Sequence, residues 1–145
     1  MAKNEPKQVI VMRRDLNMRK GKMVAQGAHA SMKAVLSCAQ NKNPGNDFIV
    51  IPLIDQSLSL VESRETRNPL REWLEGRFTK VCVGVNSEEE LLDIYETAKD
   101  AGLICALIED AGLTEFDGIP TLTCAAIGPA YPEDIDPITG DLKLL

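Results

Sequence analysis

The sequence is poor in the residues that bind metal ions. Its 145 residues include one histidine and four cysteines. Structural zinc sites usually combine four Cys or His ligands at short, regular spacings. No two cysteines form a Cys-x-x-Cys pair here, because they stand far apart at Cys38, Cys82, Cys105 and Cys124. We therefore expect no metal site and no cofactor, and we expect reduced thiols that pack as small apolar side chains.

Long apolar runs are also absent from the sequence. A helix that crosses a membrane needs about 20 mostly apolar residues. The longest candidate, Phe48–Ile54, is much shorter and contains Pro52. Residues 1–7 lack the apolar core of a secretory signal. These absences predict that the protein has no membrane partner and is cytoplasmic.

The composition is typical of one globular domain. Hydrophobic residues make up 44% of the chain and charged residues 26%. A chain of 145 residues is long enough to bury a core and too short for two ordinary domains. We therefore predict a single domain over residues 1–145.

Charge is unevenly distributed along the chain. The net charge of −6 by itself argues against a nucleic-acid partner, because phosphates are bound largely by Lys and Arg. Residues 1–35, however, hold eight basic and two acidic side chains, a balance of +6, whereas the remaining residues hold eight basic and twenty acidic ones, a balance of −12. A basic patch on an acidic body suits local contact with an RNA backbone, with chance clustering as the alternative. The basic residues of this segment are Lys3, Lys7, Arg13, Arg14, Arg19, Lys20, Lys22 and Lys33.

The order of apolar and polar runs predicts alternating strands and helices. Strands are expected at Gln8–Arg13, Thr79–Val85, Leu103–Ile108 and Leu122–Ile127. Helices are expected at Lys22–Ala39, at Pro69–Leu74 and after the capping-box pattern Ser87-Glu-Glu-Glu90. The tail at 129–137 is expected to be rich in turns, with one helical turn as an option. This alternation is typical of a layered α/β fold with a mainly parallel sheet. The connection 114–121 is too short for a crossover helix, so the last strand is either antiparallel to the third or placed elsewhere in the sheet.

The first long helix has a polar face. Lys22, Gln26, His29 and Lys33 are spaced so that all four project from one side. We expect the opposite side to pack on the sheet through Ala25, Ala28, Met32 and Val35. A polar face of this kind suits an anionic substrate, and the alternative is an ordinary solvated face.

A second group of polar residues follows the third predicted strand. Asp110 and Thr114 flank a Gly turn, and Thr121 begins the next strand. Ligands of α/β sheets gather at the carboxyl ends of the parallel strands. We therefore expect one site in which these residues meet the polar helix face: Lys22, Gln26, His29, Asp110, Thr114 and Thr121.

Taken in order, these motifs resemble the class 2 (archaeal and eukaryotic type) peptidyl-tRNA hydrolases. The matching pieces are Gly21-Lys22, Ala25-Gln26, His29-Ala30, Ala106–Thr114, Thr121–Pro129 and Thr139–Leu145. The resemblance implies a three-layer α/β/α sandwich with a four-stranded mixed sheet. It also implies an enzyme that hydrolyses the ester bond between peptide and tRNA and so recycles tRNA. The partner of the protein is then peptidyl-tRNA. A second copy of the same chain, in a homodimer, is a further candidate partner.

The resemblance also assigns roles to single residues. It implies that Lys22, His29, Asp110 and Thr114 are catalytic, and that Arg13, Arg19, Lys20, Gln26 and Thr121 bind substrate. Each role has a simpler alternative. Asp110 could brace its own turn, the threonines could be strand-end hydroxyls, and Gln26 could bond the loop before its helix.

The sequence departs from the family pattern at three places. Leu113-Thr-Glu115 stands where the family usually has Arg-Thr-Gln, which replaces a cation and an amide by an apolar group and an acid. The loop 115–120 is one residue longer than usual, and an insertion is expected at about residues 41–69. These departures leave a non-catalytic RNA- or protein-binding module on the same fold as the alternative function. A hydrolase of another small ester or amide is a weaker third reading.

Overall fold

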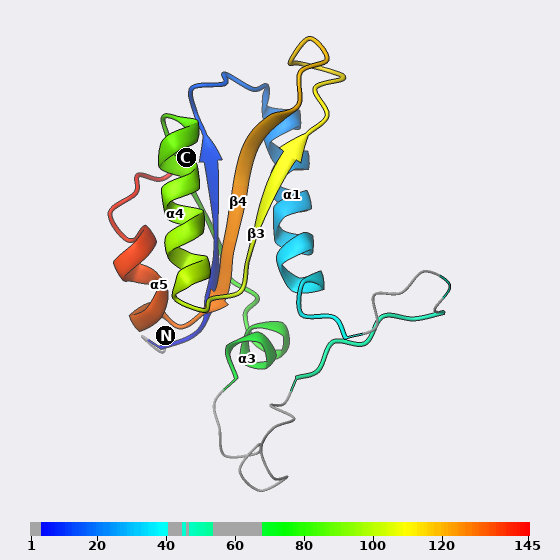
Figure 1. Ribbon diagram of the computed structural model, residues 1–145. Coiled ribbons are helices and arrows are strands. Elements are labelled where there is room, and N and C mark those ends of the chain that lie inside the picture. Colours follow the sequence, from blue (N-terminus) through cyan, green and yellow to red (C-terminus); the bar gives the residue numbers. More distant parts are fainter. Residues whose placement is uncertain (1–3, 41–44, 46, 54–67) are drawn as a thin grey trace, which may run out of the picture.

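The computed structural model describes residues 4–40, 45, 47–53 and 68–145, which form an α/β sandwich (Figure 1). The expected insertion at about 41–69 falls mostly outside these residues. The elements are β1 Lys7–Arg13, α1 Lys20–Leu36, α3 Pro69–Glu75, β2 Lys80–Val85, α4 Glu88–Asp100, β3 Cys105–Asp110, β4 Thr121–Ala130 and α5 Pro132–Thr139. None of the helices in these parts of the chain is long and apolar enough to cross a membrane.

The sheet is mixed, as the resemblance implied. It has four strands in the order β2-β1-β4-β3. β1 and β2 are parallel, whereas β4 runs antiparallel to both of its neighbours. The expectation of a mainly parallel sheet was therefore wrong. The short connection after β3 forces β4 to turn back, and β4 then fills the place between β3 and β1.

Strand β1 shows why the sheet needs helices on both faces. Its residues Val9 to Met12 are all buried, and they alternate between the two sides. Val9 and Val11 pack toward α4 and α5, and Ile10 and Met12 pack toward α1. Figure 1 shows α1 on one face and α4 with α5 on the other. This arrangement confirms the three layers.

Helix α1 begins two residues earlier than predicted and turns a different face to the sheet. Its buried residues are Gln26, Gly27, Ala30 and Ala34. The predicted packing face was wrong, because Ala25, Ala28 and Met32 are exposed and Val35 is only partly buried. Small side chains let the helix approach the sheet closely, and the amide of Gln26 is buried because it finds polar partners there.

Helix α4 begins at the predicted capping box, although one of its two bonds has a different partner, and helix α5 was predicted only as an optional single turn. The Ser87 hydroxyl accepts from the Glu90 N–H at 3.1 Å, as the capping box predicted. The Glu90 carboxylate accepts from the N–H of Asn86, one residue before the cap. The expected turn-rich tail is instead largely the helix α5, with Pro132 in its first turn and Pro137 inside it. Pro132 fits there because the first N–H of a helix has no intrahelical partner.

Candidate active site

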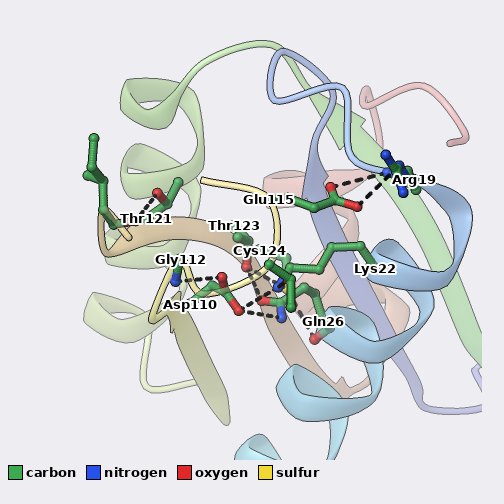
Figure 2. A network of polar contacts seen from close by, with 11 residues as sticks. Arg19, Lys22, Gln26, Asp110, Gly112, Glu115, Thr121, Thr123 and Cys124 are labelled. Carbon is green, nitrogen blue, oxygen red and sulfur yellow. Dashed lines mark hydrogen bonds and ion pairs between the residues drawn. The ribbon is translucent and has the colours of Figure 1, made fainter. Parts of the chain in front are cut away.

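The described residues bring a group of polar side chains together where β3 ends beside the first turns of α1 (Figure 2). Asp110 is the last residue of β3, and Lys22 and Gln26 reach it from α1. Thr114 approaches from the loop between β3 and β4. We call Lys22, Gln26, Asp110 and Thr114 the Lys22 cluster.

Asp110 is the acceptor at the centre of the cluster. Its Oδ1 accepts from Lys22 Nζ at 2.8 Å and from Gln26 Nε2 at 3.1 Å. Its Oδ2 accepts from the Gly112 N–H at 2.9 Å. The hydrogen bond from Lys22 is the main cause that lowers the pKa of Asp110, and the bonds from Gly112 and Gln26 add to it. Asp110 is therefore a firmly ionised carboxylate at neutral pH.

Lys22 is held by three neighbours. Besides Asp110, its ammonium donates to Thr114 Oγ1 at 2.9 Å and lies 5.6 Å from the centre of the Phe116 ring. Its side chain is only 14% exposed. The charge is thus fixed at the rim of the site rather than free in solvent.

Gln26 is oriented by a residue that the sequence did not single out. Thr123 is completely buried, and its hydroxyl donates to Gln26 Oε1 at 2.6 Å. This bond leaves the amide nitrogen of Gln26 to point at Asp110. Next to it, the Cys124 thiol donates to the Gln26 backbone carbonyl at 3.3 Å. Burial raises the pKa of that thiol to about 11, so it is not a nucleophile at neutral pH.

A bulge in β4 explains why Thr123, and not Thr121, faces the cluster. Ile108 pairs with Cys124 but Glu109 pairs with Leu122, so Thr123 is an extra residue on β4. Bulges often redirect a side chain next to an active site. The Thr121 hydroxyl donates to the Ile119 carbonyl at 2.8 Å and does not join the cluster.

The other predicted site residues lie outside the cluster. His29 is exposed on α1, and no contact joins it to the cluster among the described residues. Arg13 is 11% exposed and is engaged internally, by Asp15 at 2.6 Å and by the Leu122 carbonyl at 2.9 Å. Arg19 and Lys20 are exposed at the start of α1.

The cluster offers a fixed cation, an ionised carboxylate and a hydroxyl at the carboxyl end of β3. This set suits an attack by water on a carbonyl whose oxygen becomes negative. It contains no activated Ser or Cys, so a covalent acyl intermediate is not indicated. No group of three or more His, Cys, Asp and Glu side chains in the described ranges is arranged to hold a metal ion.

Comparison with known proteins points to the same chemistry. The family model described as "Peptidyl-tRNA hydrolase PTH2" matches residues 6–145. A protein named peptidyl-tRNA hydrolase from Methanocaldococcus jannaschii is 46% identical over 139 residues, which covers 96% of this chain and 99% of the relative. Proteins of the same name from Methanothermobacter thermautotrophicus and Methanopyrus kandleri are 41% and 40% identical, over 96% of this chain and 99% and 97% of theirs. With nearly its whole length matched, the chain belongs to the PTH2 family of peptidyl-tRNA hydrolases.

Proposed function

We propose that the Lys22 cluster is the active site of this peptidyl-tRNA hydrolase. The chain hydrolyses the ester bond that joins a peptide to tRNA, as its family membership shows. The observation that carries the proposed site is the Lys22 ammonium, fixed between Asp110 and Thr114 at the carboxyl end of β3. Because this substrate arises in translation, we also propose a cytoplasmic location.

Lys22 is suited to stabilise the oxyanion. An ammonium has three N–H donors, and the contacts to Asp110 and Thr114 use two of them. The third can donate to the ester carbonyl oxygen, which gains negative charge as water attacks. A donor that is already in place needs no reorganisation during the reaction, and this makes it more effective than solvent.

Asp110 acts as the group that orients the site. Three donors already converge on its carboxylate, and its lowered pKa makes it a weak base. We infer that Asp110 holds Lys22 and aligns the attacking water through a remaining lone pair. The attacking water then transfers its proton to a solvent molecule or to the leaving ribose oxygen.

Thr114 is placed to contact the substrate directly. Its oxygen accepts from Lys22, so its own O–H can donate to the water or to the terminal ribose. Catalysis by His29 and substrate contacts by Thr121 and Arg13 stay predictions. The departures from the family pattern leave the cluster intact, because Leu113 is 86% exposed and Glu115 turns toward Arg19. These positions therefore give no support to a non-catalytic module.

The test of the proposed site is Lys22→Ala, assayed with an N-acetylated aminoacyl-tRNA. Turnover should fall by roughly 10²–10³, the range for losing one electrostatic stabiliser of the transition state. Lys33→Ala is the matched control, because Lys33 lies on the same helix but donates to the Leu107 carbonyl, outside the cluster. Near-normal turnover in Lys22→Ala would remove the cluster from the mechanism.

We further propose that tRNA phosphates contact Arg19 and Lys20. Both side chains are exposed at the start of α1, the helix that carries Lys22, and they belong to the basic segment 1–35. Guanidinium and ammonium groups at a helix start favour phosphate through charge and through the helix dipole.

Finally, we propose a homodimer that forms through the outer face of α1. A groove of about 820 Å³ lies between α1 and α3 over the sheet, and apolar side chains form most of its wall. Val24 and Met32 line this groove on the α1 side and are 73% and 61% exposed. A two-fold axis can pack the exposed apolar side chains of one copy against the groove of the other, which gives an isologous interface. The groove is lined in part by Ile10, Met12, Ala28, Trp73, Leu74 and Phe78.

A further inference from the structure

We propose that Glu115 is a positioning residue with two effects: it ties the loop that carries Thr114 to the start of α1, and it restrains tRNA affinity by pairing with Arg19. The inference rests on the proposed function, because it assumes that Thr114 and Lys22 act on the ester. It concerns a residue that makes no contact with the reacting atoms.

The loop between β3 and β4 is internally bonded, so an anchor at one residue positions its neighbours. The Gly118 N–H donates to the Gly112 carbonyl at 2.8 Å, and the Ile119 N–H donates to the Phe116 carbonyl at 2.9 Å. Gly112 has φ +81°, and a Cβ there would collide with the backbone of Ile119. The two ends of the loop are thus packed together.

Three consecutive side chains of this loop contact the beginning of α1. Thr114 accepts from Lys22 at 2.9 Å, and the Phe116 ring lies 5.6 Å from the same ammonium. Between them, the Glu115 carboxylate accepts from the backbone N–H of Arg19 at 3.4 Å and lies 4.0 Å from its Nε (Figure 2). Glu115 is only 20% exposed. It is therefore the charged anchor of the loop.

The start of α1 has a need that Glu115 meets. Arg19 occupies the cap position, its side chain makes no capping bond, and the first turn holds no acidic residue. A helix N-terminus carries unpaired N–H groups and partial positive charge, which a nearby carboxylate stabilises. Here the carboxylate is that of Glu115, which is distant from α1 in the sequence. The same contact therefore stabilises the start of the helix and positions the neighbouring Thr114.

The same contact opposes the binding of tRNA. Arg19 is 90% exposed at the place where we expect phosphates, and Glu115 puts a negative charge beside it. This charge repels phosphate and competes for the guanidinium. Glu115 therefore restrains the affinity for tRNA.

Two variants separate the two effects. Glu115→Ala removes the acceptor and the charge, whereas Glu115→Gln keeps an acceptor oxygen and removes only the charge. Both should bind deacylated tRNA roughly threefold to tenfold more tightly at low salt, because a like charge near the phosphates is gone. kcat should fall about tenfold in Glu115→Ala, since a displaced group in the site costs rate, and Glu115→Gln should restore most of it. The control is Glu96→Gln, at an exposed acid on α4.

The outcomes that would overturn the proposal are distinct. Unchanged tRNA affinity in both variants would show that Glu115 does not weaken tRNA binding. An unchanged kcat in Glu115→Ala would show that Glu115 does not position the site. If kcat and melting temperature fell together while tRNA affinity stayed constant, Glu115 would be only a brace for the loop. Affinity for deacylated tRNA needs no hydrolysis, so it can also be measured in the Lys22→Ala background. A failure of the proposed active site is therefore separable from a failure of this inference.

Discussion

The Gln26 amide is the residue on which the geometry of the site depends most. It is buried, and it links the Thr123 hydroxyl on one side to the Asp110 carboxylate on the other. An amide can turn over and exchange its oxygen and nitrogen unless its partners distinguish them. Asp110 makes that distinction here, because its ionised carboxylate can only accept and so holds the nitrogen, while the Thr123 hydroxyl donates to the oxygen.

Thr123→Val should therefore lower activity without touching the substrate. The isosteric change leaves the buried Gln26 oxygen without its donor, which costs about 1–3 kcal/mol and lets the amide turn away from Asp110. We expect kcat to fall roughly tenfold with little change in KM, and Thr123→Ser to recover most of it. Thr139→Val is the matched control, since Thr139 is also buried and its hydroxyl donates to the Ile135 carbonyl in α5. Equal losses in both valine variants would mean that any buried hydroxyl matters.

Asp110 should link stability to pH in one direction. Its pKa in the folded protein lies below the ordinary 3.8, mainly because Lys22 donates to it. A lowered folded pKa adds stability that is complete above the ordinary value and is lost as pH falls through the folded value. Asp110→Asn should thus be less stable than the wild type by roughly 1–2 kcal/mol at pH 7, and this difference should shrink below about pH 4. Urea unfolding at several pH values measures it, and a difference that grew in acid would contradict this account.

Most residues of the cluster could be predicted from the sequence, because short-range patterns place them. Lys22 and Gln26 share a helix face by spacing alone, and Asp110 and Thr114 flank a Gly turn after a strand. Thr123 could not be predicted, because a bulge has no sequence pattern of its own and it changes which threonine of β4 faces inward.

At the scale of elements, the strands followed their apolar runs and α1 did not turn the predicted face to the sheet. Periodicity identified α1 as a helix, but the choice of buried face depends on its partners. Gln26 is buried because Asp110 and Thr123 satisfy its amide, whereas Met32 is left exposed. Those partners are distant in sequence, so pattern alone favoured the apolar side.

The start of α1 should act as the electrostatic contact with tRNA. Replacing Arg19 and Lys20 together by Ala should make log Kd for tRNA less dependent on log salt, because fewer condensed counterions are released on binding. KM should rise more than kcat falls, since such contacts act equally in the ground and transition states.

The control for that experiment is the pair Arg71→Ala and Arg77→Ala, at exposed basic residues of α3 and just after it. This pair removes the same charge at a remote surface. An unchanged salt slope in the Arg19 and Lys20 variant would place the RNA contact elsewhere.

For the molecule as a whole, the apolar groove beside α1 predicts its state of association. Stable interfaces bury about 800 Å² per partner, and in the proposed dimer this area includes the outer face of α1 around Met32. Met32→Glu should therefore convert a dimer to a monomer in sedimentation, because it would place a charge in the interface. Thr97→Glu on the exposed side of α4 is the control, and a wild type that is already monomeric at micromolar concentration would contradict the proposal.

The central position of β4 determines when this enzyme can first work. Val9 of β1 pairs with Ile127 of β4, and the two halves of the site, 22–26 and 110–123, meet only around that pairing. During synthesis β1 and α1 leave the ribosome long before β4 exists to join them. A nascent chain that still lacks β4 has the residues of the Lys22 cluster but not the strand that joins β3 to β1 in the sheet. The enzyme therefore has no means to cut the ester that holds its own growing peptide to tRNA.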